Sequence, residues 1–210
     1  MNFAAIFTIA CQEARINIRN RWTLLFAGVF GLLALAISYF GLVTEGYAGF
    51  QGFERTTASL LSLVLYLVPL VALTMATLSL TGDRGAIELL FSQPVARHEI
   101  LLGKVVGLFG SMLTAMLFGF GLAGTVIASQ VGTDGLLRFL SFTGITLLLA
   151  LSFLSLGSLL AIIGITRTRV LGLALLVWFF LVLFYDLLVM GAGFLLKERA
   201  SIQARLSKGT

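Results

Sequence analysis

Two methionines in a long apolar stretch are spaced to share one face of a helix. Met112 and Met116 lie four residues apart, and thioethers one helical turn apart are soft ligands of the kind that Cu(I) prefers. Packing is the alternative, because methionine is a flexible side chain that fills irregular gaps in hydrophobic interiors. The sequence holds no third soft ligand nearby. We therefore predict no metal site and keep both methionines as candidates for the lining of a substrate path.

One carboxylate lies inside another apolar run. Asp186 occurs in FFLVLFYDLLVMG, well past the middle of that run. A charged side chain at the centre of a membrane helix costs roughly 2.5–3.5 kcal/mol on insertion scales and usually faces a cavity or a partner. We expect Asp186 either to line a substrate path or a dimer seam, or to be satisfied locally beside Tyr185 near the outer interface.

Several kinds of chemistry are excluded by residues that the sequence lacks. Gly103 and Lys104 are followed by Val105 rather than by the rest of a phosphate-binding loop, so ATP cannot bind by that route. His98 is the only histidine and Cys11 the only cysteine, which rules out an H-E-x-x-H zinc site, a serine–histidine pair within the membrane and an intrachain disulfide. We predict that the chain is not an enzyme and holds no cofactor of its own.

The elements that must position these side chains are membrane-spanning helices. Of the 210 residues, 59% are hydrophobic and 11% are charged, whereas soluble domains carry about 25% charged residues. Five apolar stretches are long enough to cross a bilayer as helices. They cover residues 22–43, 58–80, 105–131, 139–165 and 170–196. The sequence predicts an all-α, polytopic membrane bundle over residues 1–196 and a basic tail over residues 197–210.

Basic residues between the spans indicate the orientation. Eight of them precede the first span or lie in the loops on that side (Arg15, Arg19, Arg21, Arg84, Arg97, Lys104, Arg167 and Arg169), against two in the opposite loops (Arg55 and Arg138). With five spans, the four basic residues of the tail (Lys197, Arg199, Arg205 and Lys208) would lie on the opposite side, against this bias; tails indicate orientation less reliably than short loops. Short loops rich in Lys and Arg stay in the cytoplasm, so we predict a bacterial inner-membrane protein with a cytoplasmic N-terminus. Topology and anionic lipid headgroups explain the net charge of +5. Nucleic acid is not an expected partner, because no basic stripe with interleaved aromatic residues occurs.

Two further patterns concern packing. Before the first span, apolar residues recur at helical spacing (Phe3, Ile6, Phe7, Ala10, Ala14 and Ile18) opposite a polar face (Thr8, Gln12, Arg15 and Arg19). This pattern predicts an amphipathic helix at the membrane interface, or else a plain extension of the first spanning helix. Small residues at Gly103, Gly107, Gly110, Gly119, Gly121 and Gly124 predict close contacts between helices. Pro69 predicts a kink in the second span.

A compact polar segment separates the second and third spans. Residues 82–104, the coupling segment, contain six charged residues, the only histidine and Pro94. Residues 86–91 are expected to form a short helix, Pro94 a corner, and residues 96–104 a helix that continues into the third span. The segment would then present Leu89, Leu90 and Phe91 within a charged rim, which suits docking on a soluble partner. An ordinary helical loop folded back on the bundle is the alternative.

The coupling segment resembles that of ABC-2-type transporter permeases. Its Gly85, Glu88, Leu90, Pro94, Arg97 and Lys104 stand as in G-x-x-E-L-L-x-x-P-x-x-R-x-x-x-x-x-x-K of that family. More narrowly, the chain is similar to permeases of the Nos type, which serve ABC systems for the maturation of copper nitrous oxide reductase. That similarity rests on RNRW at 19–22, ASLLSL at 58–63, LLGKVVG at 101–107, GFG at 119–121 and GLALLVWFFLVLFYDL at 172–187.

The resemblance implies partners and a role. It implies a homodimer of permeases, an ABC ATPase subunit that carries ATP and Mg²⁺ and docks at Gly85, Glu88, Leu90, Phe91, Pro94 and Arg97, and a periplasmic accessory protein. The implied function is export of a sulfur species or copper-related cargo. A membrane scaffold that moves no solute, or an exporter of another substrate, is the alternative. Family members carry a sixth span, whereas this chain ends in KERASIQARLSKGT. We expect the difference to reflect truncation, a shifted reading frame or a split gene.

Overall fold

The described part of the chain folds into long helices. The computed structural model describes residues 3–43, 49–81, 96–131, 133–163 and 166–208. For some of these residues it describes the backbone but not the side chains, namely 41–43, 49–56, 97, 128–131, 133–136, 192 and 194–208. Its helices are α1 (Phe3–Ile18), α2 (Arg21–Val43), α3 (Gly49–Leu80), α5 (Arg97–Val131), α6 (Thr133–Ile163) and α7 (Arg167–Lys208). The predicted all-α membrane bundle is confirmed.

Five of these helices are long and apolar enough to cross a membrane. The spans cover Arg21–Phe40, Thr57–Leu80, His98–Ile127, Leu137–Ile163 and Arg167–Gly191, one for each predicted stretch. The helices themselves extend past the apolar stretches, because backbone hydrogen bonding continues beyond the hydrocarbon. Thus α5 begins at Arg97, as expected for residues that run straight into the third span, and α7 continues through the basic tail to Lys208.

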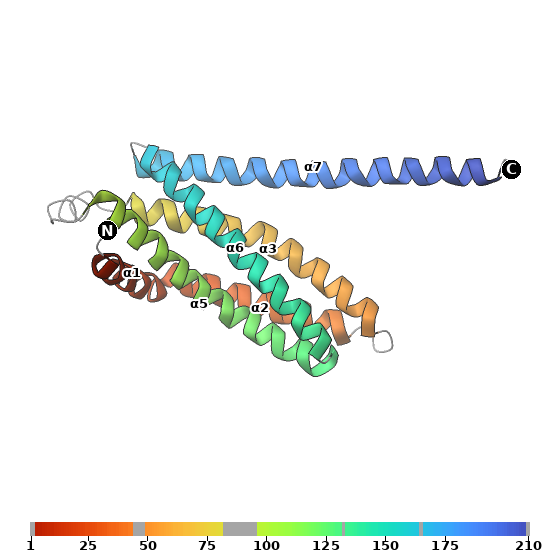
Figure 1. The fold of residues 1–210 in the computed structure, drawn as a ribbon, viewed down its shortest axis with the longest axis horizontal. Coiled ribbons are helices and arrows are strands. Elements are labelled where there is room, and N and C mark those ends of the chain that lie inside the picture. The colour runs from red at the N-terminus through yellow and green to blue at the C-terminus, as the bar shows by residue number, and fades with distance from the viewer. Residues whose placement is uncertain (1–2, 44–48, 82–95, 132, 164–165, 209–210) are drawn as a thin grey trace. The chain divides into compact units, whose positions relative to one another are not determined.

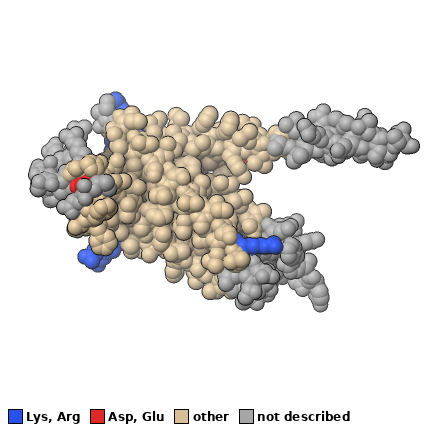
Figure 2. Space-filling model, viewed as in Figure 1, with Lys and Arg blue, Asp and Glu red and all other residues tan. Residues whose placement is uncertain are grey.

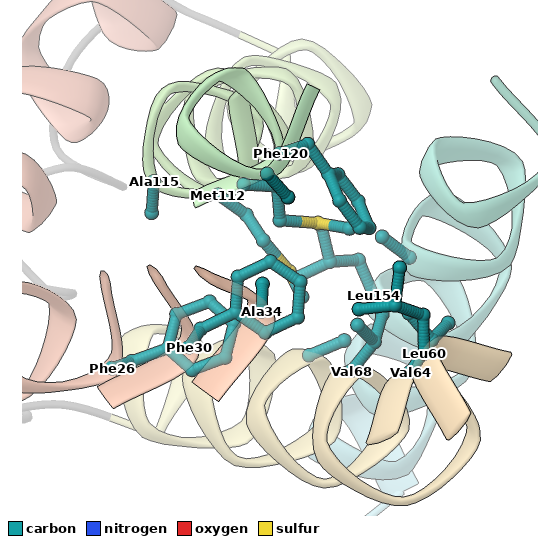
Figure 3. Packing of buried hydrophobic residues seen from close by; sticks show 14 of the residues in the cluster. Phe26, Phe30, Ala34, Leu60, Val64, Val68, Met112, Ala115, Phe120 and Leu154 are labelled. Carbon is teal, nitrogen blue, oxygen red and sulfur yellow. The ribbon is translucent and has the colours of Figure 1, made fainter. Parts of the chain in front are cut away.

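Helix α5 lies at the centre of the bundle, against α1, α2, α3 and α6 (Figure 1). The hydrophobic core forms where α2, α3, α5 and α6 meet, and Figure 3 shows side chains from these helices converging there. Phe120 of α5 makes edge-to-face contacts with Phe30 of α2 and with Phe139 and Phe142 of α6, at centroid distances of 5.1, 5.8 and 5.8 Å. These aromatic contacts join three helices at one point of the core.

Many hydroxyl groups within the spans are satisfied by their own helices. Thr77, Thr146 and Ser158 each donate a hydrogen bond to the carbonyl four residues earlier. This arrangement matters because hydrocarbon offers a polar side chain no partner. Among the described residues, charged side chains are likewise absent from the apolar part of the surface seen in Figure 2. On that face the middle of the bundle is uncharged, and the visible Lys and Arg lie toward its ends.

Glycines of α5 bring neighbouring helices close together, as predicted, at four of six positions. A Cβ at Gly103 or Gly107 would meet α1, one at Gly119 would meet Phe30 and Gly31 of α2, and one at Gly124 would meet Phe139. The prediction is wrong for Gly110 and Gly121, which have no neighbour within 4 Å. Pro69 is buried inside α3, and the helix continues on both sides of it.

Helix α1 forms as predicted but packs through a partly polar face. Ala10 lies buried against α5, together with Glu13 and Asn17, while Phe3 and Phe7 of the predicted apolar stripe are exposed. The helix ends at Ile18, and Asn20 begins α2 as its N-cap: the Asn20 side-chain oxygen accepts a hydrogen bond from the Trp22 N–H at 3.1 Å. Location at a membrane interface remains a prediction for α1, whereas its docking on α5 is a finding.

The chain divides into two compact units. The first covers Met1–Leu175 and includes the bundle and the beginning of α7; the second covers Leu176–Thr210, the remainder of α7. Within the second unit, the described side chains up to Gly193 are almost all exposed.

Candidate functional site

A buried ion pair joins α1 to α5. The Lys104 ammonium donates a hydrogen bond to Glu13 Oε2 at 2.9 Å, and the two side chains are 14% and 11% exposed. Charged side chains are seldom this buried unless they are paired, since removing a charge from water is costly. The pair is therefore a specific feature of the fold.

Two neutral side chains complete the hydrogen bonding of the Glu13 carboxylate. Oε1 accepts hydrogen bonds from the Ser79 hydroxyl at 2.5 Å and from the Asn17 amide at 2.9 Å. Lys104 also lies 3.3 Å from Ser79 Oγ and 3.4 Å from the Ser79 carbonyl oxygen. We call these four residues, Glu13, Asn17, Ser79 and Lys104, the Glu13 cluster. The other three residues all donate hydrogen bonds to the Glu13 carboxylate, which holds them together.

Small residues make this approach of α1 to α5 possible. A Cβ on Gly107 would lie 2.5 Å from the Ala10 carbonyl oxygen and 2.6 Å from Glu13 Cβ, closer than Cβ atoms come to such neighbours. One on Gly103 would lie 2.8 Å from Ile9. Gly103 and Gly107 thus form a small-xxx-small surface against which α1 lies. Any larger residue there would push Glu13 away from Lys104.

The Glu13 cluster connects the two ends of the coupling segment. Ser79 lies one residue before the end of α3, and Lys104 lies in the second turn of α5. Ser79 therefore precedes the coupling segment by three residues, and Lys104 is its last residue. Because one carboxylate bonds to both, the end of α3 and the second turn of α5 are joined to each other and to α1.

The predicted docking residues are placed only in part. Gly85, Glu88, Leu90, Phe91 and Pro94 lie outside the described residues, and the predicted short helix at 86–91 lies there with them. Arg97 is the first residue of α5, with its backbone alone described. Docking at these positions therefore stays a prediction. Lys104, which ends the family motif in the sequence, is the motif residue whose contacts the structure reveals.

The predicted substrate-path residues fall in different places. Met112 and Met116 are fully buried in the hydrophobic core among residues such as Phe30 and Leu154 (Figure 3). Asp186 has an exposed side chain on the second unit of the chain. The methionines and Asp186 thus belong to different units of the chain, and their role in a substrate path stays a prediction.

The central residue of the cluster, Glu13, escaped sequence reasoning. Glu13 belongs to neither of the residue sets that defined the apolar and polar faces of α1, and Lys104 was expected only to mark the topology and the family motif. One signal was present: Glu13 lies three residues after Ala10 and seven after Ile6, which places an acid on the apolar face of α1. Its partner is 91 residues away in the sequence, which no local pattern can indicate.

Comparison with known proteins defines the class. The sequence profile described as ABC-2 family transporter protein matches residues 7–207, and the chain belongs to this family. It is a multi-pass membrane protein of the ABC transporter permease type, and this family implies an ABC ATPase as partner.

Two curated relatives are more specific, and each is described as a probable ABC transporter permease protein NosY. The relative from Pseudomonas aeruginosa is 37% identical over 188 residues, which cover 87% of this chain and 68% of the relative. The relative from Stutzerimonas stutzeri is 36% identical over 191 residues, covering 88% of this chain and 69% of the relative. The resemblance to Nos-type permeases that the sequence motifs indicated is confirmed.

Proposed function

We propose that the chain is the permease subunit of an ABC export system that supports the maturation of copper nitrous oxide reductase. Its cargo is a sulfur species or a copper-related species. A separate ATPase subunit binds ATP and Mg²⁺ and docks at the coupling segment, while this chain performs no catalysis. The family membership and the two NosY relatives support the assignment.

The assembly that we propose follows the family pattern. Two copies of the permease form a homodimer in the inner membrane, with the N-terminus and the coupling segment in the cytoplasm. A periplasmic accessory protein receives the cargo. The excess of basic residues on the N-terminal side of the spans supports this orientation.

The observation that carries the mechanical part of the proposal is the Glu13 cluster. Ser79 and Lys104 flank the coupling segment and bond to the same carboxylate. A force applied to the segment by a docked ATPase therefore reaches α3, α5 and α1 together. Without this connection, the segment could change its conformation while the spans stayed where they were. We assign the cluster a positioning role, because it acts through the helices that it joins.

Docking is tested by co-purification of the full-length permease with its ATPase. Changing Leu90→Asp or Phe91→Asp places a charge on the predicted docking surface and should abolish recovery of the ATPase. Gly46→Asp adds the same charge to the loop predicted on the opposite side and should leave recovery unchanged. Undiminished recovery with both docking variants would refute the docking role.

The role of the cluster is tested separately by the ATPase activity of the complex in lipid. Glu13→Gln keeps the size of the side chain but removes its charge, so the ATPase should still co-purify while its stimulation by the permease falls. Arg15→Gln, on an exposed position of the same helix, serves as the matched control. A complex in which the permease never alters ATP hydrolysis, in the wild type as in the variants, would instead indicate a scaffold.

A further inference from the structure

A cavity of about 650 Å³ opens beside the Glu13 cluster, within the first unit of the chain. Its walls come from α1 and α2, from the second half of α3, from Lys104 of α5 and from the first turns of α7. The cavity is not the predicted substrate path, since Met112, Met116 and Asp186 do not line it.

The lining changes from polar to apolar along the direction of the helices. At one end lie Glu13, Asn17, Asn20, Ser79, Lys104 and Arg167. Toward the other end the walls are Val29 of α2 and Leu67 and Val71 of α3. A helix rises 1.5 Å per residue, so the cavity extends about 10 Å along α2 from Trp22 to Val29 and about 18 Å along α3 from Ser79 to Leu67.

These lengths correspond to the depth of one lipid leaflet. Half of a bilayer core of about 30 Å is about 15 Å, close to the distance over which the lining turns apolar. Trp22 lies at the polar end and is exposed, which is the position that tryptophan prefers at the boundary between headgroups and acyl chains. The polarity of the cavity therefore follows that of a phospholipid lying parallel to the helices.

The charge of the lining favours an anionic headgroup. Among the residues that the structure describes, the cavity lining contains two cations, Lys104 and Arg167, and one anion, Glu13. Lys104 and Glu13 neutralise each other, which leaves the charge of Arg167 at the polar end. Basic pockets between membrane helices bind anionic headgroups for this reason. A guanidinium in addition donates paired hydrogen bonds that fit a phosphate group.

We propose that this cavity binds one anionic phospholipid, with its phosphate at Arg167 and an acyl chain along Val29, Leu67 and Val71. The lipid belongs to the leaflet on the side of the N-terminus and the coupling segment. This inference does not depend on ATPase docking or on the cargo, so it can fail while the proposed function stands.

The test uses the full-length chain, purified in a neutral detergent and stripped of lipid. Dioleoyl-phosphatidylglycerol, dioleoyl-phosphatidylcholine and inorganic phosphate are titrated, with bound lipid counted by native mass spectrometry and stability followed by thermal unfolding. We expect one retained phosphatidylglycerol that raises Tm, weaker binding of phosphatidylcholine, and no shift with inorganic phosphate. Binding that follows phosphate alone would show an anion site without a lipid and would overturn the proposal.

Two variants separate the headgroup contact from the acyl contact. Arg167→Gln should weaken phosphatidylglycerol binding about tenfold, the usual loss for one hydrogen bond to a charged group. Arg169→Gln is the control, because Arg169 is exposed on the same helix and does not line the cavity. Val29→Trp should block the acyl chain, whereas Val106→Trp changes a similarly exposed valine of α5 outside the lining.

Three further outcomes would overturn the proposal. The first is equal binding of the two lipids by the wild type, and the second is unchanged binding in both Arg167→Gln and Val29→Trp. The third is a wild-type chain that forms a dimer and retains no lipid, together with a Val29→Trp variant that is monomeric. A second copy of the chain would then occupy the cavity in place of a lipid. Thermal unfolding of each variant without lipid shows that the variant is folded.

Discussion

The four spans of the bundle and the span formed by α7 are built from similar residues but are buried very differently. In the first four spans, 33–44% of the residues are buried within the structure, whereas 6% are buried in the fifth, which is the most apolar of all. Apolar character therefore does not determine burial here. Lipid tails are as apolar as leucine, so a membrane helix gains little free energy by moving its leucines from lipid to protein.

Close packing by small residues accompanies the burial of the spans in the bundle. The glycines of α5 at 103, 107 and 119 meet neighbouring helices, and Gly157 of α6 meets Leu73 and Ala76 of α3. The described glycines of α7 at 172, 191 and 193 have no neighbour within 4 Å. Helices of the bundle thus associate where backbones come together, and where Glu13 and Lys104 pair.

The largest effect is expected from breaking the ion pair of the bundle. Glu13→Ala leaves Lys104 without its carboxylate partner, and removing one member of a buried pair costs about 3–5 kcal/mol of unfolding free energy. Partial exposure of both side chains places this variant near about 3 kcal/mol. Thermal unfolding in detergent measures the loss. The double variant Glu13→Met with Lys104→Met should recover most of it, because no buried charge remains.

The next largest effect is expected at a glycine contact. Gly107→Ala places a methyl group 2.5 Å from the backbone carbonyl of Ala10, and such overpacking costs about 2–3 kcal/mol. Gly172→Ala introduces the same group on α7 into open space, where it should be neutral or stabilise by up to about 1 kcal/mol through helix propensity. Opposite signs for the two variants support the comparison, and equal destabilisation would contradict it.

A smaller effect is expected from a cavity in the core. Leu154→Ala removes a fully buried side chain of α6. The variant should lower the free energy of unfolding by about 2 kcal/mol, the low end for such changes. The cost of the cavity remains, but little transfer free energy is lost, because lipid tails are as apolar as leucine. Leu188→Ala on α7, where the side chain is 57% exposed, should change the stability by less than about 0.5 kcal/mol. Denaturation of both variants by a harsh detergent, followed by circular dichroism, compares them directly.

The smallest effect on stability is expected at Asp186. Its side chain is exposed on α7, so Asp186→Asn should leave the Tm of the detergent-solubilised protein without a measurable shift. If Asp186 lines a substrate path, the same variant lowers the yield of mature nitrous oxide reductase in cells that depend on this permease. An unchanged yield would remove Asp186 from the path.

Much of the fold could be predicted because the bilayer imposes it. A helix that crosses hydrocarbon must be about 20 residues long and nearly free of charge, and the five stretches in the sequence satisfy this requirement. The helix over residues 96–104 that continues into the third span was predictable as well, since Pro94 separates it from what precedes. Helix ends were less predictable, as the continuation of α7 to Lys208 shows, because hydropathy marks the hydrocarbon and not the hydrogen bonding.

The site could not be predicted to the same extent. The motif residue Lys104 was recognised, but its function as the partner of Glu13 depends on which helices become neighbours. That arrangement follows from the fit of Ala10 against Gly107, a contact between residues that lie 97 positions apart in the sequence. Sequence periodicity assigns faces to a single helix and contains no information on the distance between two of them.

The separation of Glu13 from Lys104 along the chain has a consequence for biosynthesis. A ribosome adds about 5–20 residues per second, so Lys104 is made roughly 5–18 s after Glu13, given the 91 residues between them. Throughout that interval the Glu13 carboxylate has no Lys104 ammonium to pair with, and α1 cannot dock on α5. Docking of the N-terminal helix is accordingly a late event, which takes place only after the third span has been inserted.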